Sequence, residues 1–198
     1  MTYDLLIALI GFAFVSSATP GPNNLMLMAS GANFGFRRTI PHMLGISLGH
    51  AFMVTLVGLG LGQIFELYPV AQTVMQLIST LYLLYLAWKI ATAAPPRTGE
   101  ARGKPFTFLQ AAAFQWVNPK AWYMALTAIS NFTPGDGSLG PVVLVAGVFA
   151  MTNFPSITLW ATLGTQLKRL LSRPGRLRLF NGAMALLLVL TLYPVWFG

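Results

Sequence analysis

Long apolar runs recur six times along this chain, and they constrain its fold more than any other feature. A single helix needs about 20 consecutive apolar residues to cross a hydrocarbon core of roughly 30 Å. Six stretches approach that length: about 5–31, 41–62, 68–88, 107–131, 141–166 and 179–197. These segments and short loops occupy nearly all of the 198 residues. We therefore expect an all-α membrane protein with one transmembrane domain over 1–198.

The amino-acid composition agrees with a chain that lies mostly within a lipid bilayer. Hydrophobic residues make up 56% of it and charged residues only 8%, whereas a soluble domain carries about 25% charged residues. Cysteine is absent, which excludes disulfides, thiol catalysis and thiolate metal sites. The first segment carries Asp4 and no basic stretch, and its apolar run exceeds signal-peptide length, so we interpret it as a retained helix.

The basic residues are confined to alternate loops, and this distribution predicts the orientation of the chain. Eleven of the twelve fall between segments 1 and 2, 3 and 4, or 5 and 6: Arg37, Arg38, Lys89, Arg97, Arg102, Lys104, Lys168, Arg169, Arg173, Arg176 and Arg178. The opposite side carries Asp4, Glu66 and Asp136 and no Lys or Arg. The positive-inside rule makes the basic side cytoplasmic. Both termini would then lie outside a bacterial inner membrane, in the periplasm, and basic loops of this kind argue against a nucleic acid partner.

Three segments per half is an odd number, so two similar halves would lie in the membrane in opposite orientations. Segment 1 is interrupted by Pro20-Gly21-Pro22 and segment 4 by Asn118-Pro119, while segments 2 and 5 are expected to start at Pro41 and Pro141. Paired Gly/Pro interruptions at corresponding positions indicate a transporter site built on inverted repeats. We predict halves of about 1–95 and 105–198, with a cytoplasmic linker of about 89–106.

The stretch Thr19-Pro20-Gly21-Pro22-Asn23-Asn24 is the most informative in the chain. Its two prolines lack an N–H donor and its glycine adds flexibility, so regular helical hydrogen bonding must fail here. By helical rise, Pro20 lies roughly 20 Å from one end of its segment and 15 Å from the other. A plain proline kink is the alternative. Two prolines, a glycine and two asparagines together favour a functional break near the membrane midplane.

Asn118-Pro119-Lys120 repeats this pattern, because Asn is a good N-cap and Pro suits the first position of a helix. Half-helices beginning near Pro22 and Pro119 would point their N-termini at each other, and such ends attract a carboxylate. We therefore expect a site for an anionic or zwitterionic ligand. Its predicted residues are Thr19, Gly21, Pro22, Asn23, Asn24, Asn118, Pro119, Lys120 and Asn153.

Three polar positions inside apolar segments strengthen this expectation. A lysine as deep as Lys120 costs at least ~3 kcal/mol to insert, so it should face a cavity, with snorkelling as the alternative. No Asp or Glu lies deep in any segment, so carbonyls freed by the helix break, or a substrate carboxylate, would be its partners. His50 lies about 14 Å into segment 2 and is a candidate proton site, or else a neutral histidine bonded to a carbonyl. Asn153 and Pro155 are expected to break segment 5, or to serve interhelical hydrogen bonding.

Several motifs together resemble the lysine-exporter and homoserine/threonine-exporter (LysE/RhtB) translocators. They are the stretch 19–24, Gly35-Phe36-Arg37-Arg38, Gly45-Ile46-Ser47-Leu48-Gly49, Ala87-Trp88-Lys89-Ile90 and the stretch 114–122. Within that family the motifs look most like cysteine/O-acetylserine and homoserine/threonine exporters. The resemblance implies efflux of amino acids driven by the proton motive force. It departs at His50, where many members carry an acidic residue, so either coupling differs here or the histidine provides it.

The leading hypothesis from the sequence is a secondary exporter of amino acids or close derivatives that works by alternating access. The substrate carboxylate would meet the two half-helix N-termini and Lys120, and its ammonium group the carbonyls of Thr19 and Val117, or Asn153. An uncoupled facilitator or channel for small zwitterions is the alternative. No phosphate-binding loop, carboxylate pair, nucleophile–base pair or metal cluster is present, so we predict no enzyme activity, cofactor or metal. The sequence is compatible with both a monomer and a homodimer.

Overall fold

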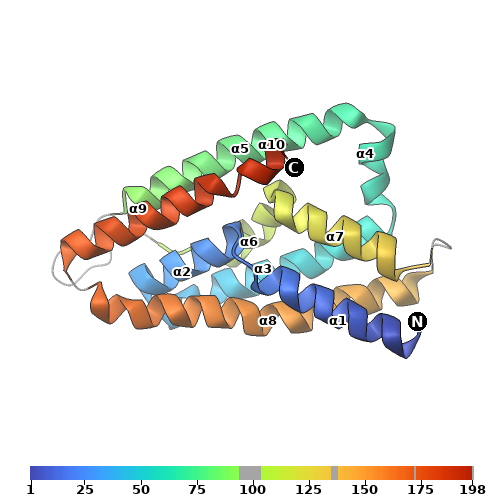
Figure 1. Cartoon of the computed structure of the whole chain (residues 1–198), viewed down its shortest axis with the longest axis horizontal. Coiled ribbons are helices and arrows are strands. Elements are labelled where there is room, and N and C mark those ends of the chain that lie inside the picture. Colours follow the sequence, from blue (N-terminus) through green and yellow to red (C-terminus); the bar gives the residue numbers. More distant parts are fainter. Residues whose placement is uncertain (94–103, 135–137, 172, 198) are drawn as a thin grey trace.

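The computed structural model describes residues 1–93, 104–134, 138–171 and 173–197, and these are folded as helices without a strand (Figure 1). The predicted Arg97, Arg102 and Asp136 lie outside the described residues. The elements are α1 (Tyr3–Ala18), α2 (Pro22–Phe34), α3 (Phe36–Gly58), η1 (Leu61–Gln63), α4 (Ile64–Leu67), α5 (Pro69–Ala91), α6 (Phe108–Phe114), η2 (Gln115–Val117), α7 (Pro119–Phe132), α8 (Leu139–Leu170), α9 (Pro174–Leu190) and α10 (Tyr193–Phe197).

Four stretches in the described part of the chain are long and apolar enough to cross a membrane: Phe36–Gly58, Pro69–Ala91, Leu139–Lys168 and Pro174–Phe197. A fifth is formed if α1 and α2, which meet at a bend of 51°, count as one broken span. The predicted fourth segment is divided among α6, η2 and α7, of 7, 3 and 14 residues, none of which has the length of a span by itself. The structure thus describes a multi-pass membrane protein with four or five candidate spans, and the sixth stays a prediction.

Two proline predictions are wrong. Pro41 lies inside α3, which begins at Phe36, and Pro155 lies inside α8, which continues unbroken from Leu139 to Leu170. Pro141 is the third residue of α8 rather than its first. One proline in a helix removes a single hydrogen bond and bends the axis, and neighbouring helices can satisfy the freed carbonyl. A single proline therefore does not end either α3 or α8.

The helix ends that carry basic residues lie together at one end of the molecule's long axis. Figure 1 shows the α2–α3 junction, the end of α5 and the start of α9 at one end of the bundle. These are the places where Arg37, Arg38, Lys89 and Arg173 lie. The N-terminus and α4 lie at the opposite end (Figure 1). The described basic loops are therefore gathered at one end, as the predicted orientation requires.

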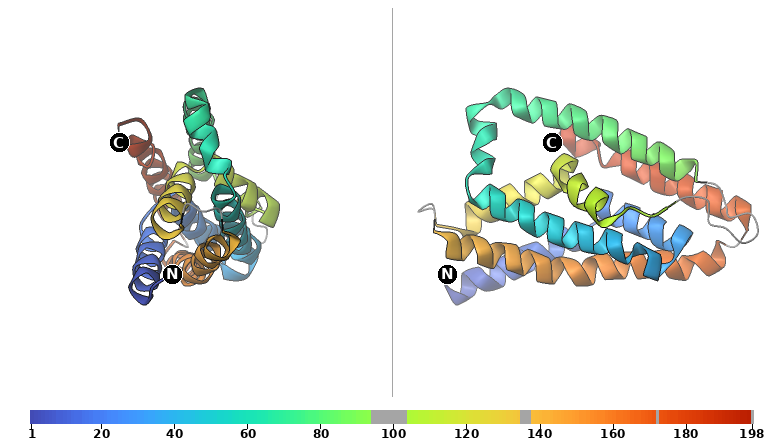
Figure 2. Two further views of the ribbon diagram at one scale, coloured as in Figure 1. Left: turned by 90° about the vertical axis from the view of Figure 1, so that its right-hand side faces the viewer. Right: turned by 180° about the vertical axis from the view of Figure 1, so that it is seen from behind.

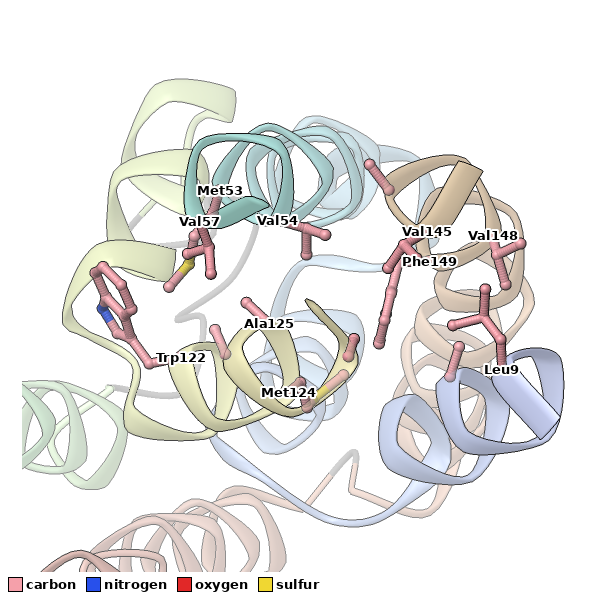
Figure 3. Close-up of a cluster of buried hydrophobic side chains, with 14 residues drawn as sticks. Leu9, Met53, Val54, Val57, Trp122, Met124, Ala125, Val145, Val148 and Phe149 are labelled. Atoms are coloured by element: carbon pink, nitrogen blue, oxygen red, sulfur yellow. The ribbon is translucent and has the colours of Figure 1, made fainter. Parts of the chain in front are cut away.

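The core joins the two halves of the chain. One buried cluster combines Leu9 of α1, Val54 of α3, Ala125 of α7 and Phe149 of α8 (Figure 3). Helices α5 and α9 contact each other along one flank of this bundle (Figure 2). Residues from distant parts of the sequence thus surround the breaks in the first and fourth predicted segments.

Helices α2 and α8 approach each other closely because glycines face the contact. A Cβ placed on Gly31 would lie 2.3 Å from the carbonyl oxygen of Ala161, and one on Gly164 would lie 2.1 Å from that of Met28. Both distances are to backbone atoms, which no side-chain movement can relieve. The close packing holds the middle and the C-terminal part of α2 against α8.

Candidate functional site

The chain breaks between α1 and α2 where the prediction placed it. Helix α1 ends at Ala18, and α2 starts at Pro22 with Gly21 as its N-cap. Thr19 and Gly21 both have extended backbones, because each precedes a proline whose ring clashes with a helical conformation there. Neither Pro20 nor Pro22 can donate a hydrogen bond to the preceding turn. The last carbonyls of α1 are consequently left without helical partners.

Side chains from two other helices, α2 and α8, bind these carbonyls. The carbonyl of Ser17 accepts from Asn24 Nδ2 at 2.7 Å and from the Ser156 hydroxyl at 2.8 Å. The carbonyl of Ala18 accepts from the Trp160 indole at 3.2 Å. Asn24 Nδ2 also donates to the carbonyl of Thr19 at 2.9 Å. The break is therefore stabilised by α2 and α8 rather than left as a flexible kink.

Lys120 completes this set, although it lies about a hundred residues away in the sequence. Its ammonium group donates to the carbonyl and the hydroxyl of Thr19, both at 2.8 Å, and lies 3.5 Å from the carbonyl of Pro20. The prediction that freed carbonyls would be partners of Lys120 is thereby confirmed. A Cβ on Gly21 would lie 2.7 Å from Lys120 Cδ, so the glycine leaves the room that this side chain needs.

The two half-helix N-termini differ from each other. Asn118 caps α7 and accepts from the backbone N–H of Lys120 at 3.2 Å, with Pro119 in the first position as predicted. No side chain among the described residues caps the first turn of α2. An anion would therefore find free N–H groups at Asn23 and Asn24 rather than at Pro119–Lys120.

Gln115 is a site residue that the sequence analysis did not single out. It is fully buried in η2 and pairs with Asn23 through two amide hydrogen bonds, of 2.8 Å and 3.2 Å. It also donates to the carbonyl of Ala111 at 2.9 Å. A glutamine within an apolar run was the available signal, since a buried amide requires partners. The pair ties the start of α2 to the break before α7.

These groups surround a small polar cavity of about 30 Å³, which we call the central cavity. Its lining includes Gly21, Asn23, Asn24, Asn118, Lys120, His50 and Asn153. Seven of the predicted polar or hinge residues thus meet in one place. Pro22 and Pro119 line the adjacent groove instead, as Lys120 and Gly21 also do. Val117 lines neither space.

His50 and Asn153 bring unused hydrogen-bonding groups to the central cavity. The His50 ring is 2% exposed and packs edge-on against Phe149 at 5.1 Å between ring centres. Its Nε2 lies 3.4 Å from the carbonyl of Ala121, whereas Nδ1 has no partner among the described residues. The Asn153 side chain likewise makes no hydrogen bond within the described part of the chain. Both can act toward a ligand.

A much larger groove lies on the other side of Gly21 and Lys120. It has a volume of about 910 Å³, and its lining is mostly apolar, including Leu25, Trp160, Leu187 and Leu190. Gly21 and Lys120 line both spaces. The polar cavity is therefore separated from a wide groove by a single layer of residues.

Comparison with known proteins places this chain among transporters. The family of LysE type translocators matches residues 14–191. The cysteine/O-acetylserine efflux proteins of Escherichia coli K12 and of Shigella sonnei are each 34% identical over 193 residues, which is 96% of this chain and 96% of theirs. No solved structure matches the chain. The family match over most of the chain and the full-length relatives show that this protein belongs to the LysE type translocators and is a transporter rather than an enzyme.

Proposed function

We propose that this protein exports small neutral amino acids or close derivatives, such as cysteine and O-acetylserine, out of the bacterial cytoplasm. The full-length relatives named as cysteine/O-acetylserine efflux proteins support this substrate class. In this proposal α1–α2 and α6–η2–α7 are the broken first and fourth spans of two inverted three-helix halves. The basic end of the bundle faces the cytoplasm of an inner membrane.

One observation carries the proposal, namely the polar central cavity enclosed by the two helix breaks. A zwitterion presents one negative and one positive end, and the cavity offers a matching set. The carboxylate binds the uncapped first turn of α2 and the Lys120 ammonium, which has three N–H donors and makes only two short hydrogen bonds.

The substrate ammonium needs acceptors on the other side of the cavity. The carbonyl of Thr19 is already bound by Lys120 and Asn24. His50 Nδ1 and the amide oxygen of Asn153 remain free. We assign the ammonium to these two groups. Among the described residues that line the cavity, Lys120 is the only one with a permanent charge. A cavity with one fixed cation suits a ligand without a charged side chain.

Transport requires this cavity to enlarge. A volume of about 30 Å³ holds about two or three water molecules, since each needs roughly 10–15 Å³ of such space. The structure therefore corresponds to a closed state. Movement of Lys120 and Gly21 would join the cavity to the groove beside α9, and the substrate ammonium at His50 Nδ1 would compete with a proton there. This competition is a route for coupling export to proton influx.

Uptake into inside-out vesicles tests the proposal. In such vesicles export from the cell becomes accumulation in the lumen, and an acidic lumen reproduces the proton gradient. We expect labelled O-acetylserine or cysteine to accumulate only when the lumen is acidic and the protein is present. Saturable movement that ignores the gradient would identify a facilitator. No movement of either compound, or of a wider amino-acid panel, would refute the proposal.

A further inference from the structure

A second cavity lies closer to the basic end of the bundle. It has a volume of about 110 Å³ and is bounded by α2, α3, α5 and the segment just before α6. We call it the basic-end cavity, and its polar lining residues are Ser30, Asn33, His42, Lys89 and Lys104. Asn33 and Asn23 both belong to α2, and ten residues of helix place the basic-end cavity about 15 Å from the central one.

His42 is the feature of this cavity that packing does not explain. The ring is 2% exposed, and neither of its nitrogens has a hydrogen-bond partner among the described residues. A buried polar group without a partner costs about 1–3 kcal/mol. In the described part of the chain, the ring contact that His42 makes is with Phe106, at 5.2 Å between centres. A phenylalanine would make that contact equally well, so the two nitrogens indicate a ligand.

The charges around the basic-end cavity indicate a negatively charged ligand. Lys89 and Lys104 are both exposed at its rim, and its described lining holds no carboxylate. Within the described residues, the Lys89 ammonium lies over the face of Tyr85, at 5.6 Å from the ring centre, and forms no ion pair. Asn33 is held in place by bonds to Asn181 and to the carbonyl of Ala29. Two rim cations and a buried imidazole with free nitrogens, in a cavity whose described lining holds no carboxylate, suit a small carboxylate.

We propose that the basic-end cavity is a second binding site, which holds the carboxylate of the exported amino acid before it reaches the central cavity. This inference rests on the proposed function. The rim lysines attract the carboxylate from solution, and the ring N–H of His42 binds it at the floor. Asn33 forms part of the wall, because both of its N–H groups are already bound to Ala29 and Asn181. Its volume exceeds that of the central cavity by more than threefold, so a small amino acid fits here with less rearrangement.

The absence of cysteine from the chain allows a direct binding test on purified protein, where both faces are accessible. Ala93 lines the basic-end cavity, and Ala93→Cys places a single thiol there for modification by N-ethylmaleimide. We expect O-acetylserine to slow this modification at least about 3-fold, and O-acetylserine methyl ester, which lacks the carboxylate charge, to have no effect. Leu179→Cys, at an exposed position outside the cavity, is the control and should react equally with and without ligand.

Variants then separate binding from folding. His42→Phe keeps the contact with Phe106 and removes both nitrogens, and Lys104→Gln removes a rim charge. Each should abolish the protection of Ala93→Cys. In vesicles, His42→Phe should raise the concentration for half-maximal transport about tenfold, equivalent to 1.4 kcal/mol, with the maximal rate unchanged. Arg178→Gln removes an exposed charge outside the cavity and should alter neither quantity.

The outcomes are distinguishable from failure of the proposed function. If the wild-type chain transports amino acids but Ala93→Cys is not protected, or is protected equally in the His42→Phe background, the second site is refuted. If no amino acid is transported but carboxylates still protect Ala93→Cys in a His42-dependent way, the site is supported and the proposed substrate class is refuted.

Discussion

Lys120→Met is the sharpest perturbation of the central cavity, because it removes the cation and keeps an unbranched side chain of similar length. The ammonium makes two hydrogen bonds of 2.8 Å to Thr19, and its third donor makes only a long one of 3.5 Å to the carbonyl of Pro20, which a substrate carboxylate would replace. A hydrogen bond to a charged group contributes about 1.5–3 kcal/mol. Loss of the bond to the substrate should therefore raise the concentration for half-maximal transport about 10- to 150-fold.

The assay compares O-acetylserine uptake into inside-out vesicles that contain equal amounts of inserted protein. Thr19→Val removes one acceptor of Lys120 and leaves both the carbonyl and the charge, so it should change the half-maximal concentration less than about fivefold. Lys168→Met removes an exposed charge at the basic end and should have no effect. The assignment of the carboxylate to Lys120 is wrong if Lys120→Met, inserted at wild-type levels, keeps a half-maximal concentration within threefold of wild type.

Three further predictions follow from particular contacts. His50→Phe keeps the packing against Phe149 but should abolish gradient-driven accumulation, while movement down the substrate gradient continues. His42→Phe, by contrast, should still accumulate substrate. Equal coupling in both variants would contradict the role of His50. Gly164→Ala forces a Cβ against the backbone of Met28 and should lower the free energy of unfolding by about 1–3 kcal/mol, seen as a lower melting temperature in detergent. Gly147→Ala in the same helix meets no atom within 4 Å and should be neutral or slightly stabilising. Asn23→Leu and Gln115→Leu should each lower the free energy of unfolding by about 1–3 kcal/mol, and the double variant by less than the sum, because each single change leaves the other amide without this partner. Additive effects would contradict the observed pairing.

The local features of the central cavity could be predicted from sequence because each depends on a few neighbouring residues. A proline has no N–H wherever it stands, so the break at 19–21 and the start of α7 at Pro119 follow from the residue types. The N-cap at Asn118 follows in the same way. The distribution of basic residues depends only on the order of apolar and charged stretches.

The absence of an N–H on proline also led us to predict a helix break at Pro155, where α8 in fact continues. At 20–22 two prolines remove donors within one turn, and Ser156, Trp160, Asn24 and Lys120 bind the freed carbonyls. At 155 one proline removes one donor and α8 continues through it. Sequence alone shows that a hydrogen bond is lost at each place. Whether the helix ends there depends on how many are lost together and on which side chains can bind the carbonyls.

The partners themselves could not be predicted, because they come from segments that are distant in the chain. Lys120 and Thr19 are 101 positions apart, and Asn23 and Gln115 are 92 apart. Both pairs join the break in the first predicted segment to the break in the fourth. The Lys120 ammonium binds carbonyls at the first break, and the Lys120 backbone lies in the first turn of α7, which follows the second break. Lys120 therefore links the two halves of the chain at the cavity. Any movement that opens the cavity must therefore break or carry these two contacts, which is why Lys120 and the Asn23–Gln115 pair are the positions where binding and conformational change can be coupled.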